Sequence, residues 1–91
     1  MVGYLRITDY DEVKHLVFNY LRERLRKEKG QVMTVRTKHI SNYFKCRISP
    51  ITLSLIISVL KELNPKVVKR KDNTYKMIFN VNELRSYLGC Q

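Results

Sequence analysis

The chain of 91 residues has few of the residues that mark several common protein classes. It has no tryptophan and no alanine, only three glycines, two prolines and two cysteines, and 8 acidic residues against 18 lysines and arginines. No apolar run approaches the roughly 18 residues of a membrane span, and the N-terminal segment has no signal-peptide apolar core. We therefore expect a cytoplasmic protein of one small domain, residues 1–91, with no membrane partner.

Patterns typical of metal sites and catalytic sites are also missing from the sequence. Cys46 and Cys90 are far apart, and together with His15 and His39 they do not have metal-site spacing. No glycine-rich phosphate loop, Ser/His/Asp arrangement or pair of carboxylates in a basic cleft is present. We expect no metal, no cofactor, no small-molecule substrate and no enzymatic activity. For the two cysteines, free thiols and a disulfide within or between chains both stay open.

Positive charge is in excess and is unevenly distributed along the chain. Residues 1–30 carry seven basic and five acidic side chains, residues 31–64 carry five and one, and residues 65–91 carry six and two. The formal net charge of +10 favours a polyanionic partner, although a merely basic protein without such a partner is the alternative.

The spacing of apolar residues and of capping residues predicts four helices and three strands. Asp9 and Glu12 form a capping-box-like start for a first helix over residues 10–29, which Gly30 would end. The other elements are predicted in this order: a strand over 31–36, a helix over 37–45 capped by Thr37, a turn over 45–49, a helix over 50–63 capped by Ser49, a β-hairpin over 66–79, and a short helix over 82–89 capped by Asn80 or Asn82.

The predicted hairpin has a basic tip. Its residues alternate between apolar and basic, turn at Asp72-Asn73, and alternate again. A two-residue loop would place Lys69 opposite Lys76 and Arg70 opposite Tyr75. Like charges directly opposite each other are unfavourable, and a neighbouring polyanion would remove that penalty, although lysines on an edge strand also prevent aggregation. One face of the hairpin would cover the core with Val68, Met77 and Phe79, and the outer face would carry Lys69, Lys71 and Lys76.

The order helix, strand, helix, helix, strand, strand, helix resembles the winged-helix family of helix-turn-helix DNA-binding domains. More narrowly, it is similar to the small winged-helix proteins of crenarchaea and their viruses. The resemblance covers about residues 10–88 and rests on the order of the elements and on the capping residues. It implies an α+β, winged helix-turn-helix fold with a three-helix core, a β-hairpin wing and a short C-terminal helix.

The resemblance also implies which residues contact nucleic acid. The helix over 50–63 would enter the major groove of duplex DNA, the helix over 37–45 would bind phosphates, and the hairpin would lie on the backbone or in the minor groove. Ser54 and Ser58 are equally compatible with ordinary solvated positions, and the polar residues of the helix over 37–45 could form an ordinary polar face. The expected DNA-binding residues are Lys38, Ser41, Lys45, Arg47, Ser49, Ser54, Ser58, Lys61, Lys69, Arg70, Lys71 and Lys76.

These patterns together predict a non-catalytic protein that binds double-stranded DNA and acts in transcriptional regulation or chromosome organisation. We also expect a homodimer through the helix over 10–29, because this helix is longer than a small domain needs to cover itself. Two other functions stay open. One is a winged-helix adaptor that binds another protein, and the other is an RNA-binding module, since phosphate charge is common to DNA and RNA.

Overall fold

Helix α1 (Tyr10–Lys27) is the longest element in this computed structural model, which describes residues 4–71 and 74–89. The Asp9 carboxylate caps it by accepting a hydrogen bond from the amide of Asp11 at 3.0 Å, as predicted. The helix ends before Gly30, because Glu28 already has an extended backbone and the Arg85 guanidinium donates to the carbonyls of Leu25 and Glu28. These hydrogen bonds give two carbonyl groups at the end of α1 a donor, so the end of the helix does not depend on a glycine.

A three-stranded antiparallel sheet lies on one side of the helices. Strand β5 (Thr74–Asn80) is central, with β2 (Val32–Arg36) and β4 (Val67–Lys71) on either side of it. The β4–β5 register places Lys69 opposite Lys76, so the predicted pairing of the hairpin is confirmed. The predicted turn residues 72 and 73 lie outside the described residues.

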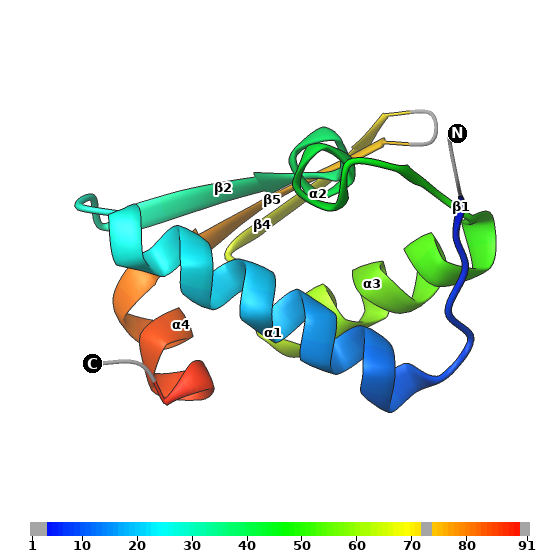
Figure 1. Ribbon diagram of the computed structural model, residues 1–91. Helices are drawn as coiled ribbons and strands as arrows, with labels where there is room; N and C mark the ends of the chain where they lie inside the picture. Colours follow the sequence, from blue (N-terminus) through cyan, green and yellow to red (C-terminus); the bar gives the residue numbers. More distant parts are fainter. Residues whose placement is uncertain (1–3, 72–73, 90–91) are drawn as a thin grey trace.

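The inner face of the sheet supplies part of the core. Met33 lies opposite Phe79 and Val35 opposite Met77, and each of these four side chains is only 1% exposed. Figure 1 shows α1, α3 (Pro50–Glu62) and α4 (Val81–Leu88) on the side of the sheet that these residues face. The buried positions of α1 complete this core with Val13, Val17, Tyr20, Leu21 and Leu25. Leu16, which has the same helical apolar spacing in the sequence, is only half-buried.

The prediction that Val68 covers the core is wrong. Its side chain is 43% exposed, although Met77, its cross-strand neighbour, is buried. Strand β4 is an edge strand, and all five of its residues are exposed. Alternation along the strand therefore gives the correct face for Val68, but the helices do not extend over this edge of the sheet.

Helix α2 (Thr37–Phe44) follows β2 directly, and its start differs from the prediction. Arg36, not Thr37, occupies the cap position, because Thr37 already has a helical backbone. The Thr37 hydroxyl instead accepts a hydrogen bond from the amide of Tyr75 at 2.9 Å and so fixes α2 to β5. The helix ends at Lys45, whose backbone is left-handed with φ 56°.

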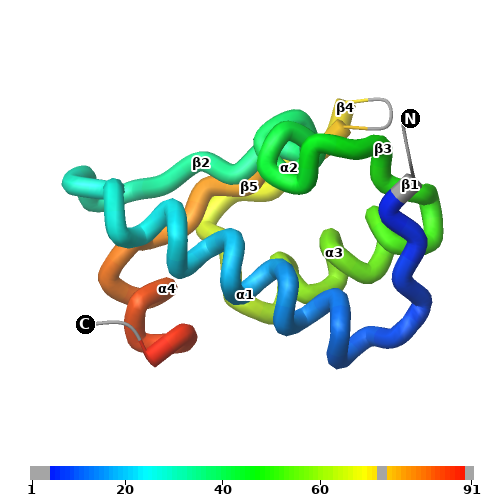
Figure 2. The backbone as a smooth tube through the Cα atoms, viewed as in Figure 1, coloured from blue at the N-terminus to red at the C-terminus, as the bar shows by residue number. Residues whose placement is uncertain are grey.

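The segment between α2 and α3 is not a simple turn. It contains β3 (Arg47–Ile48), which pairs in parallel with β1 (Tyr4–Leu5), and neither strand was predicted. Figure 2 shows β1 beside the chain that leads into α3, at the end of the molecule away from α4. The Ser49 hydroxyl then caps α3 by accepting from the amide of Thr52 at 3.3 Å, as predicted.

The last helix also has the predicted cap and end. The Asn80 side chain accepts from the amide of Glu83 at 3.0 Å, and Gly89 ends α4 with φ 69°. The described residues therefore form an α+β fold with four helices, a three-stranded antiparallel sheet and the short β1–β3 pair. None of the helices among them is long and apolar enough to cross a membrane. Cys46 is half-buried and is a free thiol in this part of the chain, whereas Cys90 lies outside the described residues.

Candidate nucleic-acid interface

Six basic residues, five of them predicted site residues, line one open hollow of about 590 Å³, which we call the cationic hollow. It lies where β2 passes into α2, next to the β4–β5 hairpin. No acidic residue is among the described residues that line it. Its lining consists of Arg36, Thr37, Lys38, Lys69, Arg70, Lys71, Thr74, Tyr75 and Lys76.

Three of these cations form a line across the sheet, which we call the cationic row. Arg36 lies opposite Lys76 in the β2–β5 register, and Lys69 lies opposite Lys76 in the β4–β5 register. Lys76 in the middle is half-buried, whereas Arg36 and Lys69 are exposed. No carboxylate of the described residues forms an ion pair with any of the three. Because like charges on directly opposite residues repel, the cationic row is an unfavourable arrangement unless an anion is bound.

A second hollow, which we call the α3 groove, separates α3 from the hairpin and has a volume of about 510 Å³. The predicted residues Ser54, Ser58 and Lys61 of α3 all line it, and all three are exposed. Arg70 of β4 lines it from the opposite side. The structure therefore brings together the predicted polar face of α3 and one predicted cation of the hairpin.

Tyr75 lies between the two hollows and lines both of them. The Lys61 Nζ atom is 5.9 Å from the centroid of its ring, and the Arg70 guanidinium carbon is 5.6 Å from it. These are cation–π distances, so the half-buried Tyr75 ring attracts one cation from α3 and one from β4. Sequence reasoning did not include Tyr75 in the site, although an aromatic residue directly opposite Arg70 is a usable signal.

Four predicted site residues line neither hollow. Ser49 is only 8% exposed, and its hydroxyl lies 2.9 Å from the hydroxyl of Thr52 while it caps α3, so the structure gives it an internal role. Lys45 and Arg47 are exposed on the segment that leads into α3, and Ser41 is half-buried on α2. Arg36 lines the cationic hollow but was not among the predicted site residues.

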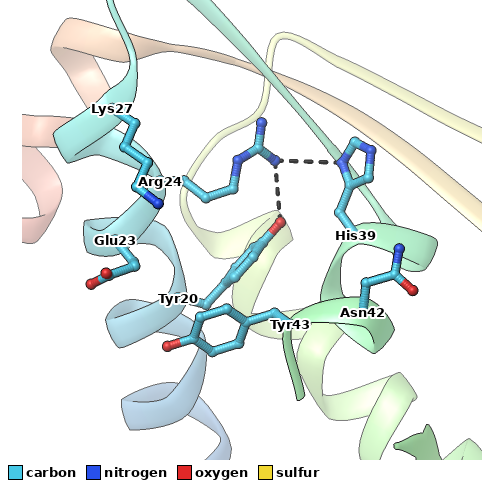
Figure 3. Close-up of a pocket in the computed structure, with 7 residues that line it drawn as sticks. All are labelled: Tyr20, Glu23, Arg24, Lys27, His39, Asn42 and Tyr43. Carbon is cyan, nitrogen blue, oxygen red and sulfur yellow. Dashed lines mark hydrogen bonds between the residues drawn. The ribbon is translucent and has the colours of Figure 1, made fainter. Parts of the chain in front are cut away.

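Arg24 joins α1 to β2, beside the start of α2, and lines neither hollow. Figure 3 shows its guanidinium between the Tyr20 hydroxyl and the His39 ring, in a separate hollow of about 470 Å³ between α1 and α2. It donates to the Thr34 carbonyl at 2.8 Å and to the Tyr20 hydroxyl at 3.2 Å, and Nδ1 of His39 is 3.5 Å away.

The protonation of His39 depends on these surroundings. Burial, together with the nearby charges of Arg24, Arg36 and Lys38, lowers the pKa of His39 below its usual value of 6.5. With its proton on Nε2, the neutral ring has a lone pair on Nδ1, the nitrogen that faces Arg24. The ring of Tyr43 also packs edge-on against Tyr20, with 5.0 Å between the centroids. α2 therefore has a defined position relative to α1 and β2, and this position sets where Lys38 lies.

The two hollows share Arg70 and Tyr75, so they form one continuous surface from α2 across the hairpin to α3. This surface offers ammonium, guanidinium and hydroxyl donors, which suit phosphate oxygens. Comparisons with protein-family models, with the sequences of characterised proteins and with solved structures found no significant match.

Proposed function

We propose that this protein is a non-catalytic, single-domain DNA-binding protein of the winged helix-turn-helix type. In this proposal α2 and α3 are the helix-turn-helix pair and the β4–β5 hairpin is the wing. Helix α3 enters the major groove of duplex DNA, and the hairpin follows the adjacent backbone or minor groove. The role that fits this activity is transcriptional regulation or chromosome organisation.

One observation carries the proposal: six cations line the cationic hollow, no acidic side chain is among the described residues of that lining, and the hollow adjoins the polar face of α3. A duplex presents a regular array of phosphates, so a surface of this kind can neutralise several of them at once. The small side chains of Ser54 and Ser58 leave room for a helix to approach base edges closely. Ile51, which is 50% exposed on α3, adds an apolar group that suits a thymine methyl.

The test is a mobility shift on specific and random duplexes at a series of salt concentrations. Replacing Lys69, Arg70 and Lys71 together with alanine removes three cations of the hairpin. We expect an affinity loss of roughly 10- to 100-fold, and a slope of log affinity against log salt that becomes shallower by up to about three. The loss should be similar on specific and random duplexes, because phosphate contacts carry no sequence information.

The matched control removes three cations from the other end of the sheet. Arg26 and Lys27 are exposed at the end of α1, and Lys29 follows shortly before β2, whereas the hairpin tip lies beyond the opposite end of β2. Replacing these three with alanine gives the same net charge as the hairpin variant. We expect this control to keep most of the affinity and most of the salt slope. Equal losses in the two folded variants would show that net charge, not the hairpin, drives binding.

Competition with double-stranded RNA separates the proposal from its nearest alternative. Preferential displacement by DNA supports the proposal, and preferential displacement by RNA of the same sequence supports an RNA-binding module. A folded protein that binds neither at low salt favours an adaptor that binds another protein. We also propose a homodimer through α1, and a molar mass measured by light scattering tests it directly.

A further inference from the structure

The cationic row has a geometry that is more specific than a general positive patch. Arg36, Lys76 and Lys69 come from three neighbouring strands and lie in register. Neighbouring strands are about 4.8 Å apart, so the backbone positions of the row span about 10 Å. Between them the row offers two gaps, one on each side of Lys76. Each gap is bordered by two cations.

The surroundings of the row add further groups that favour an anion. The start of α2 borders the same hollow, and Arg36 at its cap position makes no side-chain hydrogen bond to the first turn. The partial positive charge of the helix start is therefore not offset by its own cap residue. The Thr37 hydroxyl accepts from the amide of Tyr75, which leaves its hydrogen available for donation to an oxyanion.

The charge and size of the hollow exceed what a single phosphate requires. Each backbone phosphate of a nucleic-acid strand carries one negative charge, whereas this hollow of about 590 Å³ is lined, Arg70 aside, by five cations: Arg36, Lys38, Lys69, Lys71 and Lys76. Lys76, in the middle, is half-buried between two other cations. Two phosphate groups, one in each gap of the row, would place an anion on both sides of Lys76.

We infer that the cationic hollow is a discrete site for two adjacent phosphate groups, each bound between neighbouring members of the cationic row. The inference deepens the proposed function and rests on it for the natural source of the phosphates, which is one strand of the duplex. The same chemistry is available from a free diphosphate, so inorganic pyrophosphate is a suitable probe. A site of this kind binds pyrophosphate without any base or duplex shape.

Thermal unfolding at low salt tests the inference. Pyrophosphate at about ten times its dissociation constant should raise the Tm by roughly 5–10 °C, and sodium chloride of the same ionic strength should raise it less. Lys69→Gln combined with Lys76→Gln removes two members of the row. This variant should start from a higher Tm than the original protein, because the repulsion is gone, and pyrophosphate should no longer raise it. Lys27→Gln combined with Lys29→Gln removes the same charge elsewhere and should keep the response.

Two results would overturn the inference. One is a rise in Tm that chloride of equal ionic strength reproduces, and the other is an unchanged pyrophosphate response in the Lys69 and Lys76 variant. Arg36→Gln serves as a second variant on a different strand and should weaken pyrophosphate binding at least tenfold. If the protein binds duplex DNA but pyrophosphate does not raise its Tm, only this inference is wrong. If pyrophosphate raises the Tm but the protein does not bind duplex DNA, only the proposed function is wrong.

A competition experiment identifies the source of the phosphates. If pyrophosphate displaces a bound duplex at constant ionic strength, the hollow holds backbone phosphates of the nucleic acid. If the duplex stays bound while pyrophosphate still raises the Tm of the complex, the hollow holds a free diphosphate instead, and the assignment to a strand of the duplex is wrong.

Discussion

Replacing Arg24 with alanine tests how α1 is held against β2, which leads directly into α2. The guanidinium extends from α1, donates to the Thr34 carbonyl at 2.8 Å and to the Tyr20 hydroxyl at 3.2 Å, and lies 3.5 Å from Nδ1 of His39. A hydrogen bond from a charged donor contributes about 1.5–3 kcal/mol, and more is lost when a half-buried acceptor is left without a donor. The contact at 3.5 Å is at the limit of hydrogen-bond geometry and adds little.

We therefore expect Arg24→Ala to lower the free energy of unfolding by about 2–3 kcal/mol. For a chain of this length, the Tm should fall by roughly 10–20 °C. Urea unfolding followed by circular dichroism measures the change. The matched control is Arg26→Ala, since the Arg26 side chain is 77% exposed and its ion pair with Glu23 spans 3.6 Å. An exposed pair of this kind contributes at most about 1 kcal/mol, and usually less.

The reasoning is refuted if Arg24→Ala costs no more stability than Arg26→Ala. Its functional consequence can be checked on the same proteins. Because β2 ends in Arg36 and leads directly into α2 with Lys38, a less firmly held β2 should weaken duplex binding even though Arg24 lines neither the cationic hollow nor the α3 groove. The Arg26 variant should bind like the original protein.

The remaining predictions concern α3, the end of α2 and the dependence of stability on pH. Glutamate in place of both Ser54 and Ser58 should abolish duplex binding without unfolding the protein, since both side chains are exposed in the α3 groove; normal binding in a mobility shift would exclude that face. Lys45→Gly should raise the free energy of unfolding by about 0.5–1 kcal/mol, because Lys45 has φ 56° and glycine removes the strain of a left-handed backbone. Lys45→Ala removes the same charge but keeps the strain, so it is the control for any change in binding. The pKa of His39 is below 6.5 in the folded protein, so the unfolded chain binds a proton more readily. The free energy of unfolding should therefore fall as the pH drops below about 6.5. Urea unfolding at pH 7.5 and 5.5 measures this fall, which His39→Gln should reduce.

Local signals were sufficient for three of the four predicted helix N-caps and for the pairing within the hairpin, whereas the predicted cap Thr37 is the first residue of α2. Asp9, Ser49 and Asn80 each accept a hydrogen bond at the start of a helix, and Gly89 ends the last one. The hairpin register follows from alternation around a short loop, because a slip by one residue would turn Met77 and Phe79 outward. Such signals involve residues within a few positions of one another, so the sequence alone contains them.

Features that depend on distant pairing could not be predicted in the same way. Strands β1 and β3 have two residues each, which is too short for any periodic pattern. Alternation identified the face of Val68 but could not show that β4 is an edge that the helices leave uncovered. Arg36 joins the candidate site only because β2 pairs with β5, and Arg24 matters only because Thr34 of β2 lies within reach of α1.

The repulsion among the cations of the row lowers the stability of the free protein, whereas the same charges raise the affinity for a polyanion. In the free protein, Arg36, Lys76 and Lys69 repel one another, so screening by salt relieves a cost of folding. In a complex with phosphates the same cations attract, so the same salt weakens binding. A sequence with neutral residues in these positions would fold more stably and bind a polyanion less tightly. None of these three residues belongs to the buried core, since Arg36 and Lys69 are exposed and Lys76 is half-buried. In the proposed function, binding of an anion is the benefit that offsets their repulsion, whereas protection of the edge strands from aggregation would not require Lys76, which lies on the central strand β5.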